Sequence, residues 1–403
     1  MVGPNFIKKI NQTRILNLLR VEGTISRAEI SRRLRLTRST VSLLTADLLQ
    51  RKIIVDTRTF ESSQQTGRPG VGMQLNPNGG YCIGVEIGVE RIRVIVIDLM
   101  VKILSDTQQP LDSKDPARVV EQTVGMIQKA RLESIKENSR LFGIGLTVPG
   151  MLNRAKVVEY ALDLGWRDLD LRHILEEKFD APVYLENDAN AAALAEFYFG
   201  GIDGGENLFY LLLDVGVGAG IIIDRTIYTG SFGTAGEIGH MRLPVMIDQE
   251  EPLQTIPFEE CVGKRALLAK YRKLGGVTDD FSVFCQQVDR GEPAAIKTIS
   301  LWANMLALGI LNIIDVLNPS HIILGGPLAR FYNYVQQPLF LLQQRDYFPS
   351  ANNVQLIQSR FKEDACAMGA AALVYESLFR VVQEHDVKSS GYWIPKPLLQ
   401  KNE

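Results

Sequence analysis

The chain has 403 residues, 46% of them hydrophobic, which is enough for two or three domains with buried cores. Its first residues lack the apolar stretch of a signal peptide, and we find no run of about 18 uncharged apolar residues. We therefore expect a cytoplasmic protein with no membrane partner. Four widely separated cysteines without a CxxC pair predict neither a disulfide framework nor a zinc site, and they are Cys82, Cys261, Cys285 and Cys366.

The net charge of −2 is unevenly distributed along the chain. Residues 1–70 contain 13 Lys and Arg but 5 Asp and Glu, so the remaining residues carry a net charge of −10. A positive N-terminal segment suits a phosphate backbone, which would repel the negative remainder. The alternative is a basic helix face that is merely solvated.

The first 70 residues follow the order of a winged helix-turn-helix. Apolar residues on one face predict a helix over 12–22 that ends at Gly23. Ser26 and Glu29 form a capping box, which predicts a second helix that begins near Arg27. Thr37 is the expected cap of a third helix. A strand follows from residue 53.

The outer face of the third helix is predicted to bind DNA. Short hydroxyl side chains near an arginine suit base edges and phosphates, although any capped surface helix could carry them. Arg68 in the GRPG segment is expected to reach a minor groove, but a plain linker turn is equally natural there. The predicted DNA-binding residues are Arg38, Ser39, Ser42, Thr45 and Arg68. Because one small DNA-binding domain (a reader) binds DNA weakly, we expect a homodimer or higher homo-oligomer on a two-fold operator.

An internal repeat follows the N-terminal segment. YCIGVEIGVERIRVIVIDL at 81–99 and LFYLLLDVGVGAGIIIDRTI at 208–227 both read as strand, acidic residue, glycine turn and strand. This duplication predicts two similar α/β lobes, in which the glycine turns approach nucleotide phosphates. We expect a winged helix-turn-helix domain over 1–72, a first lobe over 73–200 and a second lobe over 201–403.

Five further motifs occur in a fixed order along the chain: GIGLTVPG (143–150), LGWRDLDL (164–171), LENDANAAALAE (185–196), GEIGH (236–240) and ILGGPLA (323–329). With these motifs the chain resembles the ROK family of repressors and sugar kinases, and in particular its xylose-responsive repressor branch, from about residue 11 to residue 379. The resemblance implies an α/β fold of the actin-like, duplicated ribonuclease H-like type, with sugar bound between two lobes.

The resemblance also implies the residues that contact a sugar: Asn187, Asp188, Glu237, His240 and Glu259. Carboxylates, amides and imidazoles suit sugar hydroxyls, which both donate and accept hydrogen bonds. Asp188 matches the catalytic base of the family's kinases. The plain alternatives are that Asp188 caps a helix beginning at Ala189 and that His240 is a satisfied core residue.

Two departures from the family's kinases argue against phosphoryl transfer. The family's metal- and phosphate-binding turn is replaced by EIGVE at 86–90, where Glu90 would bring an anion toward the triphosphate. Like charges about 4 Å apart cost roughly 4 kcal/mol at an effective dielectric of 20. In the second turn, Val215 and Val217 stand where kinases favour a glycine-rich segment that carries a hydroxyl group. We therefore expect no catalytic residues and no cofactor.

A third departure concerns metal. Most family members follow GEIGH with a cysteine-rich run that holds zinc, whereas here only Cys261 stands nearby. Since tetrahedral zinc requires four ligands, we expect no metal. Arg242 and Asp248 are candidates for ordering His240 and Glu259 in its place.

The leading hypothesis is a sugar-responsive transcriptional regulator of carbohydrate metabolism, most simply a repressor, whose partners are operator DNA and a sugar effector. Sugar would rotate the lobes and change the spacing of two readers in a dimer. The first alternative is an active ROK sugar kinase with a regulatory DNA-binding head. The second is a partner-regulated repressor that has lost its response to sugar.

Overall fold

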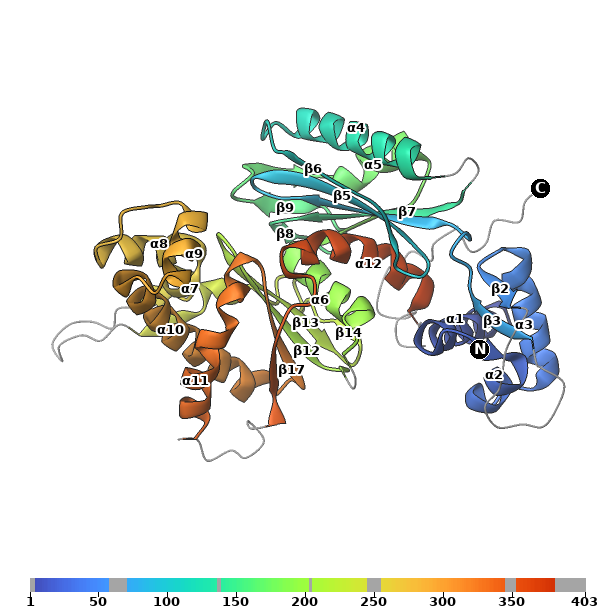
Figure 1. Cartoon of the computed structure of the whole chain (residues 1–403). Coiled ribbons are helices and arrows are strands. Elements are labelled where there is room, and N and C mark those ends of the chain that lie inside the picture. The colour runs from blue at the N-terminus through green and yellow to red at the C-terminus, as the bar shows by residue number, and fades with distance from the viewer. Residues whose placement is uncertain are drawn as a thin grey trace. The chain divides into compact units, whose positions relative to one another are not determined.

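The computed structural model describes residues 4–57, 71–135, 139–202, 205–244, 255–344 and 353–380 (Figure 1). Contacts between residues divide the chain into two interleaved units. Unit 1 comprises Met1–Val148, Asp170–Leu185 and Ala370–Glu403, and unit 2 comprises Pro149–Leu169 and Glu186–Gly369. The three-domain division at residues 72 and 200 remains a prediction.

The N-terminal part of unit 1 is a winged helix-turn-helix, as expected. Its helices are α1 (Pro4–Glu22), α2 (Arg27–Leu34) and α3 (Arg38–Gln50). Its sheet has the order β1-β3-β2, with β1 at Ile25–Ser26, β2 at Ile54–Thr57 and β3 at Gly72–Leu75. Helix α1 begins at Pro4 rather than near residue 12, and Arg68 lies outside the described residues.

Both predicted helix caps form, although one capping box is only half made. The hydroxyl of Ser26 accepts a hydrogen bond from the backbone N–H of Glu29 at 3.2 Å, and Thr37 caps α3 in the same way through Thr40. The carboxylate of Glu29 instead accepts hydrogen bonds from Arg32 and Arg33. These bonds lower the pKa of Glu29 to about 2, because they stabilise its charged form.

The rest of unit 1 is built on a five-stranded sheet with the order β11-β7-β4-β5-β6. The central strand β4 pairs antiparallel with β5 and parallel with β7. Figure 1 shows α4 and α5 beside this sheet. The elements are β4 (Tyr81–Ile87), β5 (Arg91–Asp98), β6 (Ile103–Pro110), α4 (Pro116–Ser134), β7 (Leu141–Val148), α5 (Leu171–Phe179), β11 (Val183–Asn187) and α12 (Ala365–Phe379). The end of β11 from Glu186 and the start of α12 up to Gly369 are assigned to unit 2.

Unit 2 repeats this sheet, which confirms the duplication. The order is β14-β13-β12-β17-β18, and the central strand β12 pairs antiparallel with β13 and parallel with β17. The repeated sequence segments therefore form equivalent hairpins, β4–β5 and β12–β13. The strands are β12 (Leu208–Leu213), β13 (Val217–Ile223), β14 (Thr226–Ile227), β17 (His321–Gly325) and β18 (Gln355–Gln358).

The remaining elements of unit 2 surround its sheet. Its helices are α6 (Asp188–Phe199), η1 (Ile238–His240), α7 (Glu259–Val262), α8 (Lys264–Lys273), α9 (Phe281–Asp289), α10 (Pro293–Leu317), η2 (Pro327–Phe331), α11 (Tyr332–Gln343) and η4 (Lys362–Asp364). Two small sheets complete the unit: β8 (Met151–Leu152), β9 (Val158–Ala161) and β10 (Trp166–Leu169) form one, and β15 (Arg242–Pro244) and β16 (Thr255–Pro257) form the other.

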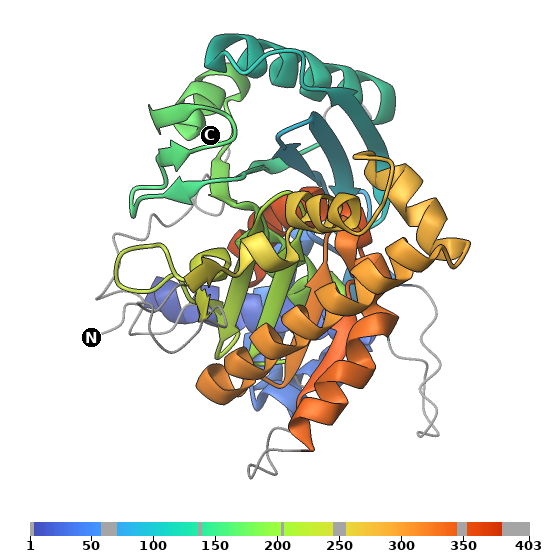
Figure 2. The same cartoon turned by 90° about the vertical axis from the view of Figure 1, so that its left-hand side faces the viewer.

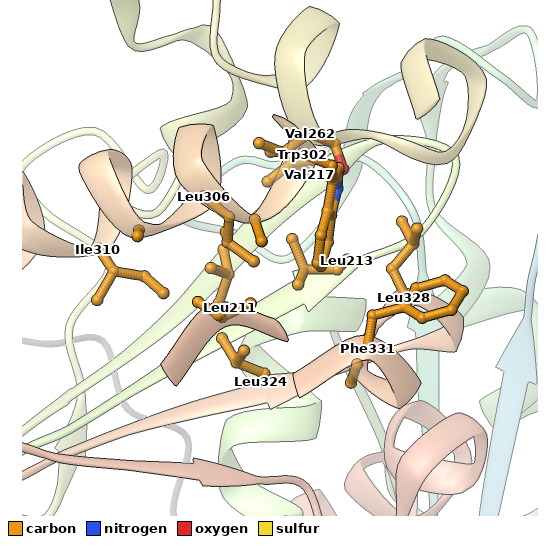
Figure 3. Packing of buried hydrophobic residues seen from close by; sticks show 14 of the residues in the cluster. Leu211, Leu213, Val217, Val262, Trp302, Leu306, Ile310, Leu324, Leu328 and Phe331 are labelled. Atoms are coloured by element: carbon orange, nitrogen blue, oxygen red, sulfur yellow. The ribbon is translucent and has the colours of Figure 1, made fainter. Parts of the chain in front are cut away.

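The core of unit 2 lies between its sheet and α10 (Figure 3). Leu306 and Ile310 on α10 face Leu211 and Leu324 on the strands, and all four are fully buried. Among the described helices, only α10 is long and apolar enough to cross a membrane by length and composition, and half of its most apolar window is buried in the unit. The sequence analysis did not single out this helix.

Candidate functional site

The NDAN segment lies where β11 runs directly into α6. Asn187 is the N-cap of α6, since its side-chain oxygen accepts hydrogen bonds from the backbone of Ala189 and Asn190 at 2.9 and 3.2 Å. Its amide donates to the carbonyl of Gly150 at 3.1 Å. Much of the hydrogen-bonding capacity of Asn187 is therefore used to hold the segment together.

Asp188 is the first residue of α6 and is half-buried. Its Oδ1 accepts a hydrogen bond from the backbone of Ala189 at 2.8 Å. The position at a helix N-terminus favours a negative charge. The helix cap is thus Asn187 rather than Asp188, and a carboxylate follows it in the first turn.

Glu186, which the sequence analysis missed, holds this segment through hydrogen bonds. Glu186 is 6% exposed, and its carboxylate accepts hydrogen bonds from the backbone of Asn187 at 3.1 Å and from the side chain of Asn190 at 3.2 Å. Lys156, from the turn before β9, forms an ion pair with the same carboxylate. The sequence signal that could have identified Glu186 is an acidic residue at the end of an otherwise apolar strand.

The second group of predicted site residues comes together around η1. Gly236 has a φ of +100°, and a Cβ there would lie 2.1 Å from the carbonyl oxygen of Ala219, so only glycine fits. Glu237 follows as the N-cap of η1. His240, at the end of η1, places its Nε2 4.0 Å from Oε1 of Glu259 on α7.

These three side chains form an open group of titratable residues. His240 and Glu259 keep 66% and 36% of their side-chain surface exposed. Desolvation by surrounding protein atoms raises the pKa of Glu237, His240 lowers it and the negative charge of Glu259 raises it. Two carboxyl groups and an imidazole in one place can accept and donate several hydrogen bonds.

Backbone pairing joins the two described ends of the segment in which the family resemblance placed a cysteine-rich run. Strands β15 and β16 pair antiparallel, and the N–H of Phe258 donates to the carbonyl of Met241 at 2.8 Å. Phe258 is fully buried against Gly309 of α10, where a Cβ would lie 2.3 Å from its ring. His240 and Glu259 each adjoin one end of this connection. In the described ranges, no group of three or more His, Cys, Asp or Glu is arranged to hold a metal.

Strand β13 connects the two groups of site residues within unit 2. Its Ala219 donates a backbone hydrogen bond to Gly236 at 2.8 Å. Helix α6 packs on the same strand, since a Cβ on Gly220 would lie 2.3 Å from the carbonyl oxygen of Ala189. The structure therefore brings Glu237, His240 and Glu259 together and places Asp188 on a neighbouring element.

The two glycine turns pair their acidic residues with cations. In the β4–β5 turn of unit 1, the guanidinium of Arg91 lies 3.9 Å from the carboxylate of Glu86, while Glu90 is exposed. In the β12–β13 turn of unit 2, Nζ of Lys264 lies 3.0 Å from Oδ1 of Asp214. A cation that already neutralises such a carboxylate competes with a metal ion for it.

The predicted DNA-binding face of α3 is confirmed as exposed at three positions and corrected at a fourth. Arg38, Ser39 and Ser42 are exposed. Thr45 is fully buried, and its hydroxyl donates to the carbonyl of Val41 at 2.8 Å, so it cannot reach a base. The face instead includes Leu43, which is 70% exposed and which the sequence analysis missed.

Comparisons with known proteins agree with this architecture. The chain matches the ROK family over residues 82–377. It is 30% identical to the xylose repressor of Bacillus spizizenii, covering 94% of this chain and 98% of that one. It is 29% identical to a glucokinase of Halalkalibacterium halodurans, covering 64% and 84%.

A crystal structure of a ROK family transcriptional regulator, a homolog of the E. coli MLC protein, superimposes with a TM-score of 0.78. The alignment covers 93% of this chain and 98% of that chain at 24% identity. This likeness extends the shared fold to the winged helix-turn-helix as well as the two α/β lobes. The chain therefore belongs to the ROK family.

Proposed function

We propose that this protein is a sugar-responsive transcriptional repressor of carbohydrate metabolism genes. One observation carries the proposal: a winged helix-turn-helix that exposes Arg38, Ser39 and Ser42 is joined in one chain to the open group of Glu237, His240 and Glu259. The first supplies phosphate and base contacts, and the second supplies partners for sugar hydroxyls. The relative from Bacillus spizizenii is a xylose repressor, which makes xylose the first effector to test.

In this proposal the sugar site binds but does not catalyse. Phosphoryl transfer depends on positioning phosphate and magnesium. Arg91 and Lys264 already form ion pairs with the acidic residues of the two turns, and Glu90 adds a negative charge to the first turn. Asp188 would then accept a hydrogen bond from a sugar hydroxyl instead of acting as a general base.

Sugar would change operator affinity only if it binds two states of the protein unequally. We propose that the liganded and free proteins differ in how they present the readers of a homodimer to a two-fold operator. The same coupling requires operator DNA to change sugar affinity by an equal factor. This reciprocity can be measured directly.

The test combines thermal shifts with operator binding. The full chain is screened against pentoses, hexoses and amino sugars, beginning with xylose. A sugar at about 100 times its Kd adds roughly 2.7 kcal/mol to the free energy of unfolding. We expect one sugar class to raise the Tm and to change operator affinity. Operator binding that is indifferent to the whole panel, with no thermal shift, would favour a partner-regulated repressor.

A second candidate function is sugar phosphorylation. The 29% identity to a glucokinase and the presence of Asp188 in its NDAN motif favour it. Sugar-dependent ATP turnover that disappears in Asp188→Ala would establish a bifunctional enzyme. ATP turnover that persists in this variant would point to a contaminant.

A further inference from the structure

The exposed face of α3 combines one arginine, several small side chains and one leucine. Its exposed residues are Arg38, Ser39, Ser42, Leu43, Ala46 and Gln50. These positions lie within an arc of roughly 140° around the helix, with Arg38 at one edge and Leu43 at the other. In Figure 1, α3 lies beside β2, and Figure 2 shows the same blue domain turned by a right angle. The serines and the alanine between the two edges allow another molecule to come close to the helix backbone.

The charge of this face favours nucleic acid as that molecule. The only acidic residue of α3 is Asp47, and its carboxylate accepts hydrogen bonds from Lys8 and Gln12 of α1 at 2.8 Å each. Asp47 is therefore turned toward α1, and the exposed residues of α3 carry no negative charge. Because Arg38 is the only charged member of the face, a duplex can approach it without repulsion between like charges.

Leu43 is the large apolar member of this face. It is 70% exposed, whereas Val41, Leu44 and Leu48 of the same helix are at most 3% exposed and belong to the core. Packing of α3 therefore leaves most of the Leu43 side chain uncovered. An apolar side chain in water gains free energy when another apolar group covers it.

The base edges of a duplex offer one apolar group in the major groove. This group is the C5 methyl of thymine, and the other groups there are hydrogen-bond donors and acceptors. The first turns of a recognition helix lie against base edges. Leu43 lies one turn after Ser39, so a helix that brings Ser39 and Ser42 to the bases also brings Leu43 to the floor of the groove.

We propose that Leu43 recognises a thymine of the operator by packing against its C5 methyl group in the major groove. Cytosine lacks this methyl group, so the contact distinguishes the two pyrimidines at one position of a half-site. This contact rests on the proposed repressor function and adds to it one base that the operator contains. A protein partner bound to Leu43 is the competing occupant, and it predicts no dependence of DNA affinity on the methyl group.

The test combines removal of single methyl groups from DNA with substitution of Leu43. The full chain first selects a duplex from a randomised pool, and each thymine of this duplex is then replaced in turn by deoxyuridine, which lacks only the methyl group. At one thymine of a half-site the replacement should weaken binding by the native protein about fourfold, the value for one methyl group that is no longer buried. Fluorescence anisotropy gives the Kd of the native protein and of Leu43→Ala on every duplex.

Leu43→Ala should bind the unmodified duplex at least about fourfold more weakly and should lose no further affinity when that one thymine is replaced. Val21→Ala is the matched control, since it shortens an apolar side chain of α1 that is 69% exposed. It should bind every duplex like the native protein, and circular dichroism should give the same Tm for all three proteins.

Two results would overturn the thymine contact while the repressor function stands. One is native affinity of Leu43→Ala for the selected duplex, which would favour a protein partner for Leu43. The other is a set of losses from Leu43→Ala and from deoxyuridine that simply add at every thymine, because residues in contact do not behave independently. Selection of no duplex at all would overturn the repressor function itself, and the thymine contact with it.

Discussion

At the scale of single residues, Asn187 and Asp188 divide two tasks that their sequence motif does not separate. Asn187 holds the start of α6 and the carbonyl of Gly150 through its side chain. Asp188 follows in the first turn, where the helix dipole favours its charge. We therefore expect substitutions of these neighbours to have different consequences.

Asp188→Ala should abolish the sugar-induced Tm shift while leaving the unliganded Tm and basal operator affinity nearly unchanged. A bound sugar hydroxyl left without its acceptor costs about 1–3 kcal/mol. For comparison, Asn187→Ala should lower the free energy of unfolding by about 1 kcal/mol even without sugar, because it removes a helix cap. Thermal unfolding with and without sugar separates the two effects. A normal sugar response in Asp188→Ala would remove this residue from the proposed site.

Glu237 gives a prediction about pH. Folding raises its pKa above the ordinary value of 4.5, so the folded protein holds this proton more tightly than the unfolded chain. Below pH 4.5 the carboxyl is protonated in both states, and its cost to folding appears as the pH rises through the higher folded pKa. Glu237→Gln should therefore be more stable than the native protein at neutral pH, and the difference should shrink in acid. Urea unfolding at both pH values measures this; a constant difference would contradict it.

At the scale of elements, the β15–β16 hairpin places two site residues that lie far apart in sequence. Pairing between Met241 and Phe258 brings the end of η1 to the start of α7. Burial of Phe258 against Gly309 then fixes this connection to α10. One packed aromatic ring and backbone hydrogen bonds thus join the two chain segments that carry His240 and Glu259.

Phe258→Ala should lower the free energy of unfolding by about 3–5 kcal/mol and weaken the sugar response, because it leaves a cavity under α7. Phe258→Leu, which retains most of the apolar volume, should lose less of both. Urea unfolding and sugar-induced Tm shifts provide the measurements.

We also expect a chelator to leave the native Tm unchanged. One zinc per chain by elemental analysis would show that metal orders this segment after all.

Helix α12 belongs to both contact units and ends at the DNA-binding part of unit 1. Its residues 365–369 are assigned to unit 2 and its residues 370–379 to unit 1. The hydroxyl of Tyr375 donates to the carbonyl of Leu99 at 3.0 Å, and Asn17 of α1 donates to the carbonyl of Phe379. We therefore expect a displacement of α12 to reach α1 through these attachments.

Asn17→Ala should therefore preserve sugar affinity and basal operator affinity but reduce the change in operator affinity that sugar causes. The reason is that the substitution removes the side chain joining α1 to α12. Asn333→Ala on the exposed side of α11 serves as the control. Operator titrations with and without sugar measure the coupling. An unchanged sugar effect in Asn17→Ala would exclude this contact from the transmission.

At the scale of the whole molecule, the charge asymmetry favours one orientation toward DNA. Residues 1–70 carry a net charge of +8 and the remainder carries −10. Phosphates therefore attract the winged helix-turn-helix and repel the two lobes. Because this attraction releases counterions, operator binding should weaken steeply with salt.

Arg38→Ala should reduce the slope of log K against log salt by about 0.9, the value for one lost phosphate contact. Ser39→Ala should change affinity without changing the slope, since serine carries no charge. Mobility shifts over a series of salt concentrations test both variants. An unchanged slope in Arg38→Ala would exclude an ionic contact at this position.

Short-range features of this protein could be predicted from the sequence. The caps at Ser26 and Thr37 involve residues three apart, so neighbouring side chains are sufficient to form them. The repeated glycine turns predicted two equivalent hairpins for the same reason, because hairpin strands are close in sequence. The family motifs predicted Glu237, His240 and Glu259 as site residues but did not show how these side chains come together.

The tertiary structure decided what depends on distant partners. Thr45 lies four residues after Val41 and shares its inward face, because the packed helices bury a wider stripe of α3 than the apolar residues alone indicate. Phe258 and Gly309 meet only when α7 and α10 pack together. Helical periodicity identifies the faces of an element, but the partner that covers a face, and how much of it, is determined by packing between segments far apart in the chain.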